Sequence, residues 1–201
     1  MMRRVRHSGL LWIVKTLALA GLVTASPALA GWTLVPAGQT VVVGQLKLTP
    51  PTAWNAQTGS TARGVAWTHD GFELNLLEVT VTRSGEPLYR ERHRRRGVGG
   101  VLPPQFALID LVDLFESGFR AGSGATVFII DQASPAKLAG LPAVEIRYRF
   151  SLSEDALPSR GLVRLAIIGD AVHAINFTAP TLHYFDAGQE EARRIMDGAR
   201  L

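Results

Sequence analysis

The clearest pattern in the chain lies at 143–150, where apolar side chains recur at every second position and Glu or Arg stands between them. A period of two residues is typical of a β-strand that buries one face. Two more strands are predicted at 161–168 and 171–178. Gly169 and Asp170, which separate them, suit the positive φ angles of a tight hairpin turn. The sequence therefore predicts three consecutive antiparallel strands in this region.

Shorter strand patterns occupy other parts of the chain. They lie at 32–36 (a lead-in or edge strand), 40–49 (one strand with a break at Gly44), 64–68 with 72–76 (a hairpin) and 126–131. The apolar alternation changes parity after residue 76, which predicts a bulge or kink near Leu77. Trp54 lies among Thr, Ser, Gly and Asn residues, which favour a loop. Proline cannot donate to a strand ladder, so Ser134-Pro135 is expected to end the strand at 126–131.

Two helices complete the set of predicted elements. Pro103 and Pro104 suit a helix start, a broad apolar face follows at 106–119, and a Gly-Ser-Gly sequence ends the helix. Asp186 and Gln189 have the spacing of a capping box, which predicts a closing helix packed on the sheet. The order strands, helix, strands, helix indicates an α+β fold: a single domain with a mainly antiparallel sheet flanked by helices.

Four short motifs accompany these elements after residue 30. They are Pro51-x-x-Trp54 after the first strand pattern, Gly140-Leu-Pro-Ala143 leading into Tyr148-x-Phe150, the hairpin end Ala179-Pro180, and the final helix. This arrangement resembles the PsbP-like family, which implies a compact α-β-α sandwich that acts as an accessory or binding subunit and not as an enzyme. The family has no shared catalytic motif for these positions to match, so the resemblance carries over no functional residue.

The first thirty residues have the pattern of a cleavable export signal. Four basic side chains are followed by an apolar run at 16–24, and the small residues Ala28 and Ala30 stand third and last before Gly31. A membrane anchor is the alternative. However, Lys15 interrupts the apolar segment and Pro27 ends it, well short of the roughly 20 residues needed to span a bilayer.

Sec-type export follows from this interpretation, because the rest of a twin-arginine signal is missing. We expect cleavage after Ala30 and a periplasmic or secreted location. We also expect a soluble mature chain, 31–201, that forms one domain without a transmembrane segment.

Composition limits the functions of that mature chain. The sequence contains no cysteine, which excludes disulfides, thiolate catalysis, cysteine-based metal sites and a lipid anchor through a thioether. The whole chain has 21 Lys and Arg against 17 Asp and Glu, and the predicted signal holds four of the former and none of the latter. The mature chain is therefore neutral overall, so its net charge gives no reason to expect nucleic-acid binding.

The strongest local charge lies at 90–96. This segment contains Glu91, His93 and five arginines: Arg90, Arg92, Arg94, Arg95 and Arg96. Guanidinium groups bind phosphate and carboxylate bidentately, so an exported protein could use the segment on anionic lipid, lipopolysaccharide or an acidic partner. The alternative is a solvated charged loop between a strand and a helix.

Residues suited to catalysis are present without a recognisable arrangement. His173 shares parity with the apolar positions of its strand, so we expect a structural, hydrogen-bonded histidine. His69 lies in a predicted turn, and His183 precedes the last helix, where its aromatic neighbours are expected to anchor that helix. Ser84 and Ser123 lack the Gly-x-Ser-x-Gly nucleophile elbow. The sequence predicts no metal, cofactor or catalytic site.

The favoured hypothesis is therefore an exported envelope protein that serves as a non-catalytic binding or accessory module, with another envelope protein or an anionic envelope component as its partner. The second hypothesis is a peripheral binder of anionic lipid or polysaccharide through the Arg90–Arg96 segment. The third is a hydrolase with an unrecognised site.

Overall fold

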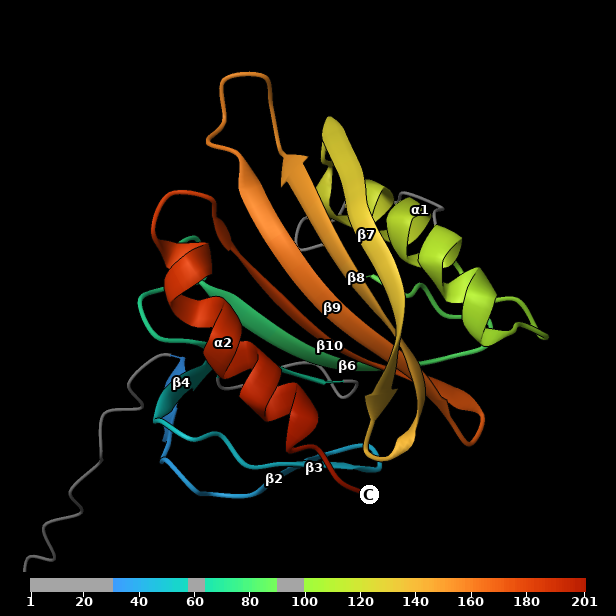
Figure 1. Ribbon diagram of the computed structural model, residues 1–201, viewed down its shortest axis with the longest axis horizontal. Helices are drawn as coiled ribbons and strands as arrows, with labels where there is room; N and C mark the ends of the chain where they lie inside the picture. Colours follow the sequence, from blue (N-terminus) through green and yellow to red (C-terminus); the bar gives the residue numbers. More distant parts are fainter. Residues whose placement is uncertain (1–30, 58–63, 90–99) are drawn as a thin grey trace, which may run out of the picture.

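One eight-stranded antiparallel sheet forms the centre of the protein (Figure 1). The computed structural model describes residues 31–57, 64–89 and 100–201. In spatial order the strands are β1 (Trp32–Val35), β4 (Trp54–Gln57), β5 (Gly64–Thr68), β6 (Leu76–Arg83), β10 (Ala171–Pro180), β9 (Ser159–Ile168), β8 (Leu141–Ser151) and β7 (Val127–Leu138). The three strands with the strongest sequence pattern are confirmed as β8, β9 and β10. Gly169 lies in the turn between β9 and β10 and has φ 63°.

Both faces of the sheet are covered (Figure 1). A small separate hairpin of β2 (Val41–Val43) and β3 (Leu46–Leu48) covers one face together with α2 (Tyr184–Asp197), while α1 (Leu111–Ser123) covers part of the other. The alternation of strand side chains divides the interior into two cores. Phe177 and Ile175 of β10 face the α2 core, and Val172 and Ala174 face the α1 core. The predicted α+β sandwich is confirmed.

Strand β10 joins the two halves of the sheet. It pairs with β6 on one side, where Ile175 lies opposite Val79, and with β9 on the other, where Ile175 lies opposite Arg164. The side chains of β10 from Ala171 to Phe177 are all buried. This strand therefore contributes to both cores and to both sheet halves.

An aromatic cluster fills the α1 core around Tyr148. The Tyr148 ring lies 5.2 Å from Phe115, 5.1 Å from Phe119 and 5.0 Å from Phe128, centroid to centroid. Its hydroxyl donates to Asn176 Oδ1 at 2.8 Å. Burial raises the pKa of Tyr148 well above its ordinary value, with a smaller contribution from Tyr89. The hydroxyl therefore keeps its proton and remains a donor.

Two predictions for the first half of the chain were wrong in detail. Trp54 does not lie in a loop: it starts β4, and its indole is fully buried against Trp67, with ring centroids 6.4 Å apart. Residues 40–49 do not form one broken strand but the β2–β3 hairpin, which turns at Gly44 with φ 60°. Trp54 was predicted in a loop because its neighbours in the sequence are short and polar. Gly44 was predicted as a break within one strand, whereas it forms the turn between two strands.

The predicted hairpin at 64–68 and 72–76 also needs correction. The second strand begins at Leu76, and residues 69–75 form a longer connection. The ladder between β6 and β10 runs without a register shift past Leu77, so no bulge lies there. The apparent change of parity arose because Phe72 and Leu74 belong to the connection and not to the strand.

Strand β7 continues through Pro135, which was expected to end it. Because β7 is the last strand of the sheet, proline needs to donate no hydrogen bond on its outer side. An irregularity in pairing lies instead between Ile130 and Gln132, where one extra residue bends the strand.

α1 starts later than predicted, and α2 starts earlier. α1 begins at Leu111 after a single 3-10 turn at Leu108–Asp110, and it ends at Gly124 with φ 72°, as expected. α2 begins at Tyr184, so Asp186 lies in its first turn and is not the cap of a capping box. The Gln189 side-chain amide donates to Asp186 Oδ1 instead of reaching back to a cap.

We expect Gly161→Ala to destabilise the protein by about 1–3 kcal/mol. A Cβ on Gly161 would overlap the ring of Tyr148, which lies directly over this glycine from the adjacent strand. The free energy of unfolding from denaturant titration is the measurement. In a Tyr148→Leu background the same substitution should cost clearly less, and an equal cost in both backgrounds would show that the ring is not the cause.

Candidate functional site

The arginine-rich segment lies outside the described residues. The predicted roles of Arg90, Arg92, Arg94, Arg95 and Arg96 therefore stay predictions. The residues on either side of the segment are described.

Those flanks form a short antiparallel stem. Gly85 N donates to Leu102 O at 2.8 Å, Leu102 N donates to Glu86 O at 3.0 Å, and Leu88 N donates to Gly100 O at 2.9 Å. Leu88 and Leu102 are buried in the α1 core. Residues 85–88 and 100–102 are thus paired with each other directly after β6, and two leucines hold this stem in the core.

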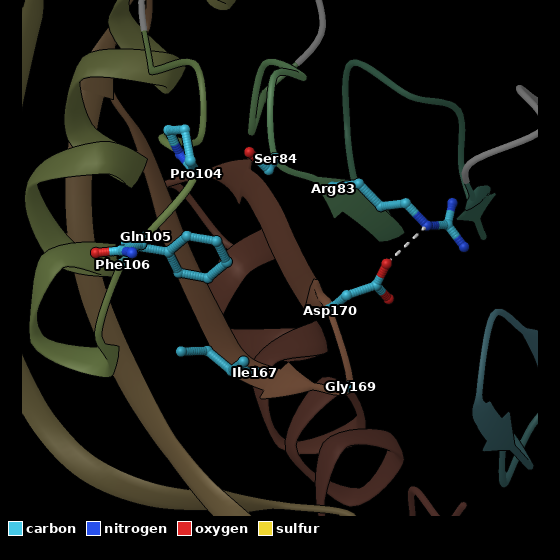
Figure 2. A pocket seen from close by; sticks show the side chains of 8 residues that line it. All are labelled: Arg83, Ser84, Pro104, Gln105, Phe106, Ile167, Gly169 and Asp170. Carbon is cyan, nitrogen blue, oxygen red and sulfur yellow. Dashed lines mark ion pairs between the residues drawn. The ribbon is translucent and has the colours of Figure 1, made fainter.

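A pocket of about 550 Å³ opens at the foot of this stem (Figure 2). Its walls come from three places in the sequence: the end of β6, residues 104–106 after the stem, and the β9–β10 turn. The paired stem sets the distance between the first two walls, and the hairpin turn at Gly169 supplies the third. The pocket is therefore a product of the fold and not of one loop.

The pocket combines an apolar floor with a charged rim. Phe106 and Ile167 lie on one side of it, and on the other side the Asp170 carboxylate points toward Arg83 (Figure 2). Arg83 Nε lies 3.8 Å from Asp170 Oδ2, and their side chains are 62% and 81% exposed. Such an exposed ion pair contributes at most about 1 kcal/mol, so both charges remain available to a ligand. Ser84 and Gln105 add polar groups.

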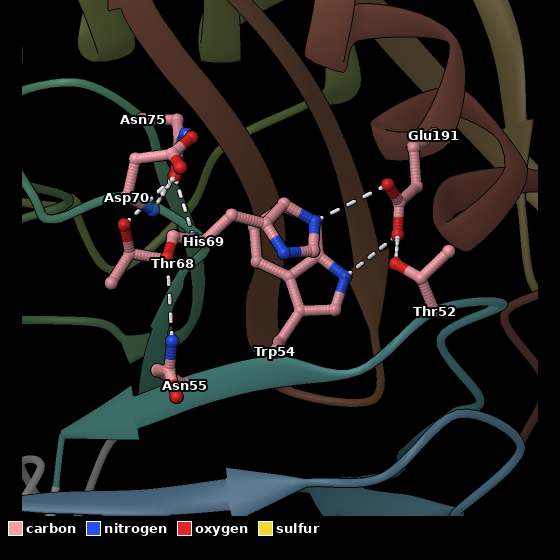
Figure 3. Close-up of polar contacts among 8 residues, drawn as sticks. All are labelled: Thr52, Trp54, Asn55, Thr68, His69, Asp70, Asn75 and Glu191. Atoms are coloured by element: carbon pink, nitrogen blue, oxygen red, sulfur yellow. Dashed lines mark hydrogen bonds and ion pairs between the residues drawn. The ribbon is translucent and has the colours of Figure 1, made fainter.

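A second polar cluster surrounds Glu191 of α2 (Figure 3). Glu191 Oε1 accepts hydrogen bonds from Thr52 Oγ1 and from Trp54 Nε1, the latter at 2.9 Å. Its other oxygen, Oε2, lies 3.3 Å from His69 Nε2, and the His69 ring packs against Trp54 at a tilt, with centroids 3.8 Å apart. One carboxylate therefore ties α2 to β4 and to the connection between β5 and β6.

The connection that carries His69 is itself fixed by Asn75. Asn75 Oδ1 accepts from the Thr68 hydroxyl at 2.8 Å and from His69 N at 2.7 Å, and its amide donates to Asp70 Oδ2 at 2.6 Å. The His69 backbone N–H and the Asp70 carboxylate serve the turn, whereas the His69 ring reaches beyond it to Glu191. Both oxygens of Glu191 already have partners, so this cluster stabilises the fold. The open pocket is therefore the better candidate for binding a ligand.

His173 is buried beneath the β2–β3 hairpin, as the parity argument predicted. Its Nε2 accepts a hydrogen bond from Gln45 N at 3.3 Å, and a Cβ at Gly44 would lie 2.8 Å from the same nitrogen. Burial lowers the pKa of His173 and Arg83 lowers it further, whereas the Ala171 backbone and Asp170 oppose the shift. The neutral His173 ring accepts a hydrogen bond from the backbone of the β2–β3 turn, so its role is structural.

A buried ion cluster fastens the C-terminal end of α2. Arg164 of β9 donates to Glu145 Oε2 at 2.7 Å, to Asp197 Oδ1 at 2.6 Å and to Lys137 O at 3.1 Å. Burial alone lowers the pKa of Arg164, but the hydrogen bonds to Asp197 and Glu145 outweigh it and raise the pKa. The buried charge is thus matched by its partners.

The remaining sequence candidates do not converge. Ser123 Oγ donates to Phe119 O at 2.6 Å as part of the helix end. His183 precedes α2, where Phe185 anchors the helix in the core as expected. Within residues 31–57, 64–89 and 100–201, no group of three or more His, Asp or Glu side chains is placed to hold a metal ion. No helix in the same residues is long and apolar enough to cross a membrane.

Comparison with known proteins adds a decisive observation on the fold. No protein-family model matches the sequence, and no curated protein is significantly similar to it. The structure superimposes on the solution structure of cyanobacterial PsbP (CyanoP) from Synechocystis with a TM-score of 0.52 and 12% sequence identity. The match covers 90% of this chain and 98% of that chain. The chain has a PsbP-like fold.

Two further structures are similar to this PsbP-like chain to a lesser degree. A protein from Bacteroides thetaiotaomicron has a TM-score of 0.48 and 12% identity, over 81% of this chain and 48% of that chain. A protein of unknown function from Pseudomonas aeruginosa has a TM-score of 0.42 and 10% identity, over 79% of this chain and 92% of that chain. The match to cyanobacterial PsbP confirms, at the level of the fold, the family resemblance inferred from the sequence motifs.

Sequence reasoning missed both polar sites. Thr52 and Glu191 are 139 residues apart, and Arg83 and Asp170 are far apart in the same way. The available signal for the pocket was Asp170 in a hairpin turn together with Arg83 at the end of a strand pattern. The sequence patterns gave Asp170 a role in the hairpin turn only, and they assigned no role to Arg83.

We expect Glu191→Ala to lower the free energy of unfolding by about 1.5–3 kcal/mol, because it leaves the buried Trp54 N–H without its acceptor. Urea titration followed by tryptophan fluorescence is the measurement. Glu190→Ala, at the exposed neighbouring position, is the control and should change stability by less than about 0.5 kcal/mol. Equal effects of the two substitutions would contradict the assignment.

Proposed function

We propose that this protein is an exported, non-catalytic binding or accessory module of the bacterial cell envelope, and that it contacts its partner through the pocket at the foot of the stem. The observation that carries the proposal is the pocket itself. It is formed by three parts of the chain and has an apolar floor beside two exposed, weakly paired charges. The PsbP-like fold supports it, because the sequence resemblance implies accessory or binding subunits.

The size and chemistry of the pocket suit a binding role. Its volume of about 550 Å³ lies within the range of roughly 300–1,000 Å³ that is typical of ligand sites. Phe106 and Ile167 can contact an apolar group, while Arg83 can pair with a carboxylate or phosphate on the same ligand. Among the described residues that line the pocket, none is a histidine or lysine that could activate the Ser84 hydroxyl. Binding accounts for these side chains better than hydrolysis does.

A crosslinking experiment in cells tests the pocket. A photoreactive amino acid is placed at Gln105, an exposed pocket residue, and in a matched strain at Ser117 on the exposed side of α1. We expect a dominant adduct from position 105 and none of the same mass from position 117. Ser84→Trp, which fills the pocket mouth, should reduce the adduct at least about fivefold, since the pocket contact is lost.

The chemical identity of the adduct separates the three hypotheses. A protein or a small envelope ligand supports the proposal. An adduct with lipid or polysaccharide that disappears when the five arginines of the Arg90–Arg96 segment are changed to alanine supports the second hypothesis instead. Turnover of ester, phosphate or glycoside substrates by the purified protein, abolished by Ser84→Ala, would contradict a non-catalytic role. The same adduct from both positions would contradict the pocket.

Export is tested separately. We expect the full chain, expressed in a Gram-negative bacterium, to accumulate in the periplasmic fraction with Gly31 as its N-terminal residue, because the Ala28-x-Ala30 sequence matches a signal-peptidase site. Intact mass and N-terminal sequencing measure this. Ala30→Arg should leave the uncleaved form. A cytoplasmic product that begins near Met1 in the unchanged chain would contradict export.

A further inference from the structure

Three exposed leucines gather at the end of the sheet opposite the pocket. Leu152 and Leu157 lie in the connection between β8 and β9, and Leu182 lies between β10 and α2. Their exposed fractions are 53%, 66% and 68%. Thr181 N donates to Pro158 O at 2.9 Å, so the two connections are joined. Single exposed leucines need no explanation, but three on two joined loops are a candidate for contact with a partner. We call these residues the leucine end.

The backbone next to Leu182 is held in an unusual conformation. His183 has φ 65° and ψ −58°, and Tyr184 N donates to Leu182 O at 2.7 Å. This is the rare and strained γ-turn with positive φ, adopted by a residue that is not glycine. The anchoring of Phe185 in the core and the bond from Thr181 to Pro158 hold the turn on both sides. The fold therefore fixes Leu182 in a solvent-facing position.

Acidic side chains border the leucines. Glu154 and Asp155 lie between Leu152 and Leu157, are exposed, and form no ion pair with any residue that the structure describes. The nearby Arg160 is already paired with Asp186 at 2.8 Å. The leucine end thus has an apolar centre with a negative border. An anionic lipid surface would be repelled by that border, whereas a protein surface with Lys or Arg around an apolar groove would be complementary.

We propose that the leucine end is a protein-docking surface for a partner with an apolar groove bordered by basic residues. The surface is independent of the pocket. The pocket and the leucine end lie at opposite ends of β9 and β10, each ten residues long, which is about 30 Å at the usual rise of a strand. Both surfaces can therefore be occupied at once, and the protein can hold two components apart at a fixed distance (Figure 1).

The test begins with the full chain in its own cells. A photoreactive amino acid at the exposed Ser153 keeps all three leucines, and the same residue at Ser117 is the control. Any protein captured from position 153 is identified and purified, and its affinity for the purified mature chain is measured by calorimetry. Two variants follow: Leu152→Ser with Leu182→Ser, and Glu154→Lys with Asp155→Lys. The control variant is Val42→Ser with Ile109→Ser, at apolar positions of comparable exposure elsewhere on the surface.

We expect each of the two leucine-end variants to weaken binding at least about tenfold, and the control variant to change it less than about twofold. Because all substituted side chains are more than half exposed or lie in exposed connections, their melting temperatures should stay close to that of the unchanged chain. A lipid adduct, an adduct with a second copy of this chain, no adduct at position 153, or a captured protein whose affinity is indifferent to both variants would each overturn the proposal. None of these outcomes depends on the pocket.

Discussion

The pairing of β6 with β10 is the interaction on which the rest of the structure depends. Eight residues of each strand lie opposite one another, from Ala171 with Arg83 to Thr178 with Leu76. This ladder connects four strands from the first half of the chain to four from the second half. Its side chains enter both cores, and its end at Arg83 forms one wall of the pocket. Without this ladder, the protein would be two half-sheets, each with an open apolar edge.

The sequence predicted the elements whose patterns are local and long. The strands after residue 140 carry apolar patterns of eight or more residues, and His173 could be placed on the apolar side of its strand from parity alone. Short elements were misjudged because a few residues carry little periodicity: Trp54 starts a strand of four residues, and the β2 and β3 strands have three each. Pro135 misled because its effect depends on whether a strand lies at the edge of the sheet, which only the topology decides.

The two polar sites could not be predicted, since each joins residues that are distant in the chain. Glu191 meets Thr52 and His69 only when α2 lies across β4, and Arg83 meets Asp170 only through the central ladder. The two sites differ in one physical respect. The carboxylate of Glu191 is occupied by its own neighbours, whereas the charges at the pocket are exposed and weakly paired. That difference, and not residue type, distinguishes the Glu191 cluster, which stabilises the fold, from the pocket, which can bind a ligand.

The irregular course of β7 has a consequence for assembly. An outermost strand with regularly spaced free peptide groups can take up a strand from another molecule. In β7 the pairing shifts between Ile130 and Gln132, Pro135 has no N–H, and Lys137 adds a positive charge near the end. These features interrupt the row of backbone groups with which a strand from another molecule could form hydrogen bonds. Extension of the sheet by another molecule from the β7 side is therefore disfavoured.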